Sequence, residues 1–257
     1  ILVYADYPED WDTTFKNVWA EVVEIPDFNF RAAVEQALGI EVGENITKEV
    51  LAQLTILDAS GRQIKNLSGI ESCISLTELN LSENQLTDLT GFNGANLPHL
   101  KTLKLDQNQL TDLSDLAGAN LPNLAVLGLY GNQLTSLSSL AGANLPTLQT
   151  LDLNNYFGSS SNQLTDLSGL AQANLPKLQT LDLYGNQLTD LSGLAEANLP
   201  ALTYLGISQN PLSKDTVLNQ IPKLKETIRT IEFTPQSFLA PIIGDVNGDQ
   251  IVNIFDL

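Results

Sequence analysis

A motif with a period of 24 residues recurs along the middle of the chain, and it constrains the fold more than any other feature. The copies "LTELNLSENQLTDL", "LKTLKLDQNQLTDL" and "LQTLDLYGNQLTDL" begin at Leu76, Leu100 and Leu178, and related copies bring the number to seven over residues 54–212. Alternating leucines predict a short strand with one apolar face. Because a single strand cannot bury that face alone, the copies must stack into a solenoid with a shared leucine core.

The spacing of these copies, L-x-x-L-x-L-x-x-N-x-L, resembles the leucine-rich repeat. The resemblance implies an α/β repeat solenoid, a horseshoe with a parallel β-sheet on its concave face. An asparagine recurs at the bend after each strand, where its amide can satisfy backbone groups that would otherwise be buried and unpaired. We therefore predict a structural role for the column Asn84, Asn108, Asn132, Asn162, Asn186 and Asn210.

The segments that flank the repeats are predicted to be caps. In residues 25–53, one helix should begin at Asp27 and end at Gly39, and a second should follow Thr47. These two helices resemble the helical N-terminal caps of internalin-like bacterial proteins. Residues 213–233 are predicted to form a helix and then a strand that closes the other end, and residues 234–243 to form a linker. Residues 1–24 are unassigned, and "ILVYA" fits either the end of a signal peptide or a short strand.

The charge and the scarcity of reactive side chains exclude several classes of function. With 30 acidic and 12 basic residues the formal net charge is −18, which disfavours nucleic acids and anionic membranes and favours cations or basic partners. No apolar run is long enough to be a transmembrane segment. The single cysteine, Cys73, lies among core positions, and the single histidine, His99, occupies a solvent position of the repeat. We therefore do not expect an enzyme.

The residues that point outward from the strands form the predicted ligand-binding surface. Tyr130, Tyr184 and Tyr204 place large aromatic rings among small polar residues, which suits contact with a protein or a glycan. The alternative is that these rings only fill the space beside Gly128, Gly131, Gly185 and Gly206.

Asp152 and Asp182 should be neighbours on adjacent strands, where like charges are destabilising. Solvent could screen them, one pKa could be raised, or a cation could lie between them. Because a flat sheet offers no cleft to desolvate an acid, we expect solvated carboxylates and not the paired acids of a glycosidase.

One repeat contains six extra residues, within "NNYFGSSSN". A loop that interrupts a strict repeat indicates function more strongly than the repeat itself. Tyr156 and Phe157 in this loop are therefore predicted contact residues, and the alternative is that both rings fold back onto a neighbouring coil.

Residues 244–257 contain a calcium-loop spacing. Oxygen ligands stand at positions 1, 3, 5, 7, 9 and 12 of "DVNGDQIVNIFD": Asp245, Asn247, Asp249, the Ile251 carbonyl, Asn253 and Asp256. The segment resembles the first calcium loop of a dockerin, which implies calcium as a cofactor and a cohesin-like domain as a partner. Gln250 replaces the usual glycine, so we expect weak binding. We also expect that the natural chain continues beyond Leu257 into a second loop.

These features favour a secreted or cell-surface bacterial binding protein. It would present its concave face to a protein or glycan partner and use the dockerin-like tail for attachment. The alternative is a structural building block of an extracellular assembly or surface layer.

Overall fold

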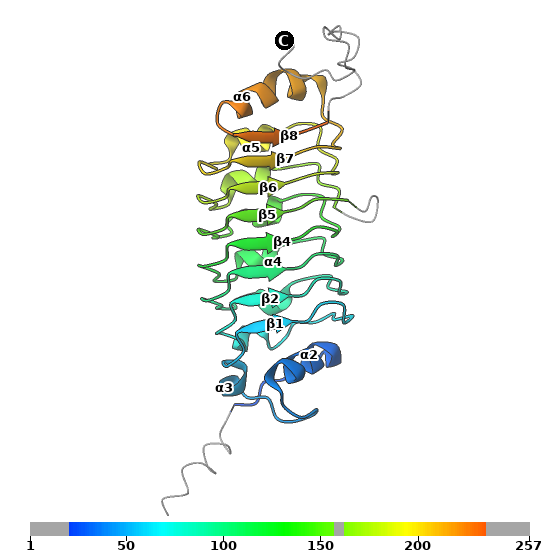
Figure 1. Cartoon of the computed structure of the whole chain (residues 1–257), viewed down its shortest axis with the longest axis vertical. Coiled ribbons are helices and arrows are strands. Elements are labelled where there is room, and N and C mark those ends of the chain that lie inside the picture. Colours follow the sequence, from blue (N-terminus) through cyan, green and yellow to red (C-terminus); the bar gives the residue numbers. More distant parts are fainter. Residues whose placement is uncertain (1–20, 157–161, 235–257) are drawn as a thin grey trace, which may run out of the picture.

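The structure, a computed structural model, describes residues 21–156 and 162–234. Eight parallel strands form one open sheet in the order of the sequence. Figure 1 shows the strands stacked along the long axis of the molecule, with short helical turns behind them. This arrangement confirms the predicted solenoid with a parallel sheet. The strands are β1 (Ile56–Asp58), β2 (Glu78–Asn80), β3 (Thr102–Lys104), β4 (Val126–Gly128), β5 (Thr150–Asp152), β6 (Thr180–Asp182), β7 (Tyr204–Gly206) and β8 (Thr230–Glu232).

Every strand pairs with the next one in the same register. The central leucine of each strand faces the central leucine of its neighbour, from Leu57 opposite Leu79 to Leu181 opposite Leu205, and Ile231 continues the row in β8. The longer coil keeps this register, since Leu151 still pairs with Leu181. The insertion therefore leaves the register of the sheet unchanged.

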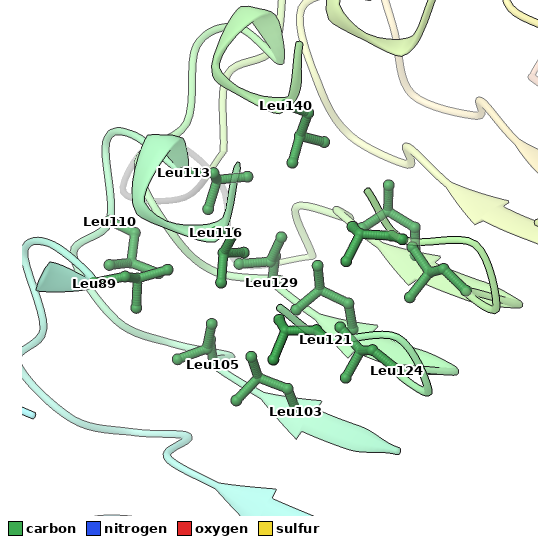
Figure 2. Packing of buried hydrophobic residues seen from close by; sticks show 14 of the residues in the cluster. Leu89, Leu103, Leu105, Leu110, Leu113, Leu116, Leu121, Leu124, Leu129 and Leu140 are labelled. Carbon is green, nitrogen blue, oxygen red and sulfur yellow. The ribbon is translucent and has the colours of Figure 1, made fainter. Parts of the chain in front are cut away.

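The inward leucines form one continuous core. Figure 2 shows leucines from strands, bends and helical turns converging between the two sides of the coil, among them Leu103, Leu116 and Leu121. All three are fully buried. Burial of this apolar surface is the main term that stabilises the stack, because each coil shares its leucines with the next.

The asparagine column links each bend to the preceding coil. Asn132 is fully buried; its Oδ1 accepts from the Leu110 amide at 3.0 Å, and its Nδ2 donates to the carbonyls of Leu105 and Leu129 at 2.9 and 3.0 Å. Asn162 follows the insertion and makes the same kind of contacts, with the Leu134 amide and the Leu129 carbonyl. The predicted structural role is confirmed.

Short helical turns form the side of the coil opposite the sheet. They span three to five residues, so the chain crosses this side without a long helix. They are η1 (Ile70–Ser72), η2 (Thr90–Phe92), α4 (Ser114–Ala117), η3 (Ser138–Leu140), η4 (Ser168–Gln172) and α5 (Ser192–Glu196).

The N-terminal cap contains the two predicted helices, α2 (Phe28–Leu38) and α3 (Lys48–Leu51). Asp27 Oδ1 accepts from the amides of Asn29 and Phe30, and Gly39 ends α2 in the left-handed conformation. Asp27 Oδ2 also accepts from the amides of residues 65 and 66, so this one side chain starts the helix and joins it to the first coil.

At the other end, the π-helical turn η5 (Thr216–Gln220) runs into α6 (Ile221–Lys225), and β8 then joins the sheet. The predicted helix and strand are both present. No helix in the described ranges is long and apolar enough to cross a bilayer. The alternatives for residues 1–5 fall outside the described residues.

Candidate binding surface

The outward residue after each central leucine forms a continuous column across the concave face, as predicted. Parallel pairing aligns Asp58, Asn80, Lys104, Gly128, Asp152, Asp182, Gly206 and Glu232. Most members are at least partly exposed, but Gly128 and Gly206 are buried. Neighbouring side chains must therefore lean over these two glycines.

Carboxylates cover both glycines. A Cβ on Gly128 would lie 2.5 Å from Asp106 Oδ1, and a Cβ on Gly206 would lie 2.6 Å from Asp182 Oδ1. Only glycine leaves room for an acid at these two positions. The expected alternative, that tyrosine rings fill these spaces, therefore does not hold for Gly128, and at Gly206 the Tyr204 hydroxyl lies farther away than the carboxylate.

Asp152 and Asp182 are direct neighbours on β5 and β6, as predicted. Both side chains are only partly exposed, and burial is the main cause that raises the pKa of each carboxyl. The charge of Asp152 raises the pKa of Asp182 further. The two carboxylates are therefore partly desolvated, which favours the alternative of a raised pKa over full solvation.

Asp106 is an acidic residue of this surface that the sequence reasoning did not select. It is 8% exposed and accepts hydrogen bonds from the Tyr130 amide at 3.2 Å and the Ser82 hydroxyl at 3.3 Å. Burial, followed by the charge of Asp152, raises its pKa to about 6. The available signal was Gly128 on the next strand, which leaves a space that a neighbouring side chain can enter.

The insertion places Tyr156 on the concave face. Its ring stacks on that of Tyr184 in the next coil, with centroids 4.5 Å apart and planes at 25°. Tyr156 nevertheless remains 63% exposed. The ring therefore folds onto a neighbouring coil, as the alternative expected, and it still presents a face to solvent; its role as a contact residue stays a prediction. Phe157 lies outside the described residues.

The other two predicted tyrosines are held by hydrogen bonds. The Tyr130 hydroxyl accepts from Gln107 Nε2 at 2.8 Å, and the Tyr204 hydroxyl donates to Glu232 Oε2 at 2.9 Å. Both rings are partly exposed. Their fixed hydroxyls orient the rings and lower the entropy that a partner would have to remove on binding.

Asn154 lies between the two acidic neighbours and has an incomplete set of partners. Its Nδ2 donates to Asp152 Oδ1 at 2.6 Å, and the Asn154 side chain also lowers the pKa of Asp182 against the larger effect of burial. The residue is 4% exposed, and its Oδ1 has no hydrogen-bond partner. Such buried acceptors are rare in native proteins.

The remaining predicted groups do not join this surface. Cys73 is buried, and burial raises the pKa of its thiol to about 12, so it is no nucleophile at neutral pH. Across residues 21–156 and 162–234, no group of three or more His, Cys, Asp or Glu side chains is placed to hold a metal ion. The predicted calcium ligands Asp245, Asn247, Asp249, Ile251, Asn253 and Asp256 all lie outside the described residues.

Comparison with protein families gives two matches. A family described as "Leucine rich repeat" matches residues 74–134, 98–155 and 160–212, which together make up more than half of the chain. A family described as "Leucine Rich repeats (2 copies)" matches residues 52–94. These ranges include all seven repeats found in the sequence.

Three similar proteins come from bacteria. The crystal structure of an internalin C2 from Listeria monocytogenes is 32% identical, with 81% of this chain and 94% of that chain covered and a TM-score of 0.53. A leucine-rich repeat protein from Leptospira interrogans is 30% identical over 74% of this chain and 45% of its own, with a TM-score of 0.58. Internalin J from Listeria monocytogenes is 38% identical over 64 residues, which are 25% of this chain and 7% of that protein. The chain thus spans a small part of internalin J and less than half of the Leptospira protein.

Proposed function

This chain belongs to the leucine-rich repeat family and is of the internalin-like type, and on that premise we propose that it binds a protein or glycan partner through its concave face. The observation that carries the proposal is the exposed Tyr156 ring stacked on Tyr184. The proposed contact residues are Tyr130, Asp152, Tyr156, Phe157, Asp182, Tyr184 and Tyr204.

The leucine core stabilises the fold whichever residues occupy the outward positions of the strands. These positions are therefore free to carry a binding surface. Tyr130, Tyr184 and Tyr204 stand at such positions and add little to the core, whereas exposed aromatic rings are typical of contact surfaces. The surface lies over β4–β7, and its last residue, Tyr204, contacts Glu232 of the C-terminal cap strand β8.

We also propose that the protein acts outside the cell, secreted or at the bacterial surface, and without catalysis. The similarity to internalins from a bacterium supports this proposal of where the protein acts. The open sheet supports binding over catalysis, because an acid that faces solvent on one side is poorly placed to exclude water from a reaction.

The dockerin-like tail remains a further proposal. Its three carboxylates, two amides and one carbonyl suit calcium, and the segment would attach the protein to a cohesin-like domain. We expect calorimetry to show calcium binding at the millimolar end of calcium loops, lost in an Asp245→Ala, Asp249→Ala double variant. Indistinguishable calcium titrations of the two proteins would remove the metal from this proposal.

The main proposal can be tested on an array of purified extracellular proteins and glycans. We expect a partner that binds the intact chain and binds less to Tyr130→Ala, Tyr184→Ala and Tyr204→Ala variants and to a chain lacking residues 156–161. The melting temperature should change little, because none of these side chains belongs to the core.

Gln172→Ala and Glu196→Ala are matched controls, because both residues are exposed on the helical side. If a partner binds all four concave variants normally but no longer binds these two controls, the binding site lies on the helical side. Size-exclusion chromatography separates the alternative: a surface-layer building block should self-associate, whereas we expect a monomer.

A further inference from the structure

We infer that Asp152, Asn154, Tyr156, Asp182 and Tyr184, here called the Asp152–Asp182 patch, receive an arginine side chain of a protein partner. The inference rests on the proposed function and names the chemical group that the concave face recognises. Three features of the patch carry it: two neighbouring carboxylates, a stacked aromatic pair and an acceptor without a donor.

The carboxylates retain acceptor capacity towards solvent. Both hydrogen bonds that Asp152 accepts, from the Asn154 amide at 3.1 Å and from Asn154 Nδ2 at 2.6 Å, end on Oδ1. The bond from the Tyr184 amide to Asp182 likewise ends on Oδ1, at 3.0 Å. Within the described residues no cation pairs with either carboxylate, so the patch is negative, partly desolvated and uncompensated.

Asn154 Oδ1 points independently to a missing donor. An unpaired buried acceptor costs free energy that a matching donor recovers. The amide that carries this oxygen donates to Asp152, and Asp152 and Asp182 are direct neighbours, so a donor that reaches the gap between the two carboxylates also comes close to Asn154. The ligand must therefore bring several N–H groups and a positive charge.

Tyr156 and Tyr184 select among cations. The Tyr156 ring stacks on Tyr184, whose backbone amide donates to Asp182, so the aromatic pair borders this carboxylate. Burial, and then the charges of Asp182, Tyr184 and Asp152, raise the pKa of the Tyr156 hydroxyl. A guanidinium is planar, stacks on aromatic faces and carries five N–H donors, whereas an ammonium is a compact point charge. The described residues offer no group of three metal-ligating side chains here, so an organic cation fits better than a metal ion. A protein partner supplies arginine, and a glycan does not.

The test uses the full chain and three blocked tripeptides as probes: Gly-Arg-Gly, Gly-Lys-Gly and Gly-citrulline-Gly. Citrulline keeps the shape of arginine and removes its charge. In an NMR titration we expect the arginine peptide to shift the backbone amides of Asn154 and Tyr184. The lysine peptide should bind more weakly, and the citrulline peptide should give no saturable shift.

The variants Asp152→Asn, Asp182→Asn and their combination remove charge with little change of shape. We expect the double variant to bind the arginine peptide at least about tenfold more weakly, since charge-assisted hydrogen bonds are the strong ones. Tyr156→Leu, at an exposed side chain whose loss leaves the core intact, should also weaken binding. Asp58→Asn is the matched control, because Asp58 stands in the same column with the same kind of bonds to its Oδ1 but lies on β1, away from the patch, and this variant should bind like the original protein.

Equal binding of the arginine and citrulline peptides, or unchanged binding by the double Asp variant, would overturn the inference. Either result is compatible with the proposed function if a partner still binds the tyrosine variants of β4–β7 more weakly than it binds the original protein. Conversely, a partner that ignores those tyrosines would end the proposed function, whatever the peptides do.

Discussion

At the scale of single residues, buried polar side chains differ in whether each of their donor and acceptor atoms has a hydrogen-bond partner. The column asparagines have partners for both oxygen and nitrogen, whereas Asn154 and Asn155 each keep an oxygen without a partner. The asparagines with complete partners hold the bends in place. Those with incomplete partners lie where the insertion leaves the repeat, beside the proposed binding surface.

Asn132→Ala should be strongly destabilising. It leaves the Leu110 amide and the carbonyls of Leu105 and Leu129 without their side-chain partner inside the core. An unsatisfied buried group costs about 1–3 kcal/mol, so we expect a loss of about 3 kcal/mol or more in urea unfolding. His99→Ala, at an exposed repeat position, is the control, and an equal, small effect of both changes would contradict the structural role.

Asp106 should make stability fall as the pH rises. Its pKa is raised from 3.8 to about 6, so between these values the folded protein holds a proton that the unfolded chain has released. The free energy of unfolding therefore decreases through this window. Asp152 and Asp182 shift in the same direction and add to the slope.

Asp106→Asn keeps the shape and removes this proton. We expect the variant to be about 1–2 kcal/mol more stable than the original protein at pH 7, allowing for solvent screening, and to differ less at pH 4. Denaturant unfolding at both pH values measures the difference. Parallel pH profiles for the two proteins would show that Asp106 does not titrate in this range.

At the scale of elements, the strands are three residues long and depend on their neighbours for stability. Each strand contributes one central apolar side chain, and its outward residues are free to vary. A strand this short has no stability of its own, so the stacking of leucines between coils supplies it.

Leu127→Ala in β4 should cost about 2–5 kcal/mol, as truncation of buried leucines generally does. Leu127 is fully buried, whereas Lys104, on the outward side of β3, is exposed. Lys104→Ala should change stability by no more than about 0.5 kcal/mol. Chemical denaturation compares the two, and similar losses would mean that the inward and outward positions are wrongly assigned.

The strands and their register could be predicted because leucine spacing alone determines which side of each coil is buried. The α2 helix could be predicted because Asp27 and Gly39 act locally. The position of the Asp106 side chain over Gly128 could not be predicted, since it depends on a residue 22 positions away in the next coil. The stacking of Tyr156 on Tyr184 depends on the path of an inserted loop, which no repeat pattern determines.

At the scale of the whole molecule, the charge is strongly unbalanced. The net charge is −18, and the ion pairs Arg31–Glu35 and Lys48–Glu21 both lie in the N-terminal cap. Within residues 54–212, 13 acidic and five basic side chains leave an excess of negative charge on the stack. Mutual repulsion of this kind destabilises a compact state and also keeps it soluble.

Added salt should therefore raise the melting temperature. Raising the ionic strength from about 0.01 M to about 0.15 M shortens the screening length from about 30 Å to about 8 Å, which weakens repulsion between coils. Each kcal/mol gained should raise the melting temperature by about 2–4 °C. Thermal unfolding in sodium chloride, with sucrose as an uncharged control, measures this effect, and a melting temperature that falls with salt would contradict it.

The common register of the strands also has a consequence for inheritance. The copies that begin at Leu100 and Leu178 share the same leucine and asparagine positions, so a duplication or loss of the segment between them would add or remove whole coils. Each product would still pair leucine with leucine and keep both caps. The length of the concave surface can therefore change by whole coils between related proteins, without a change of fold.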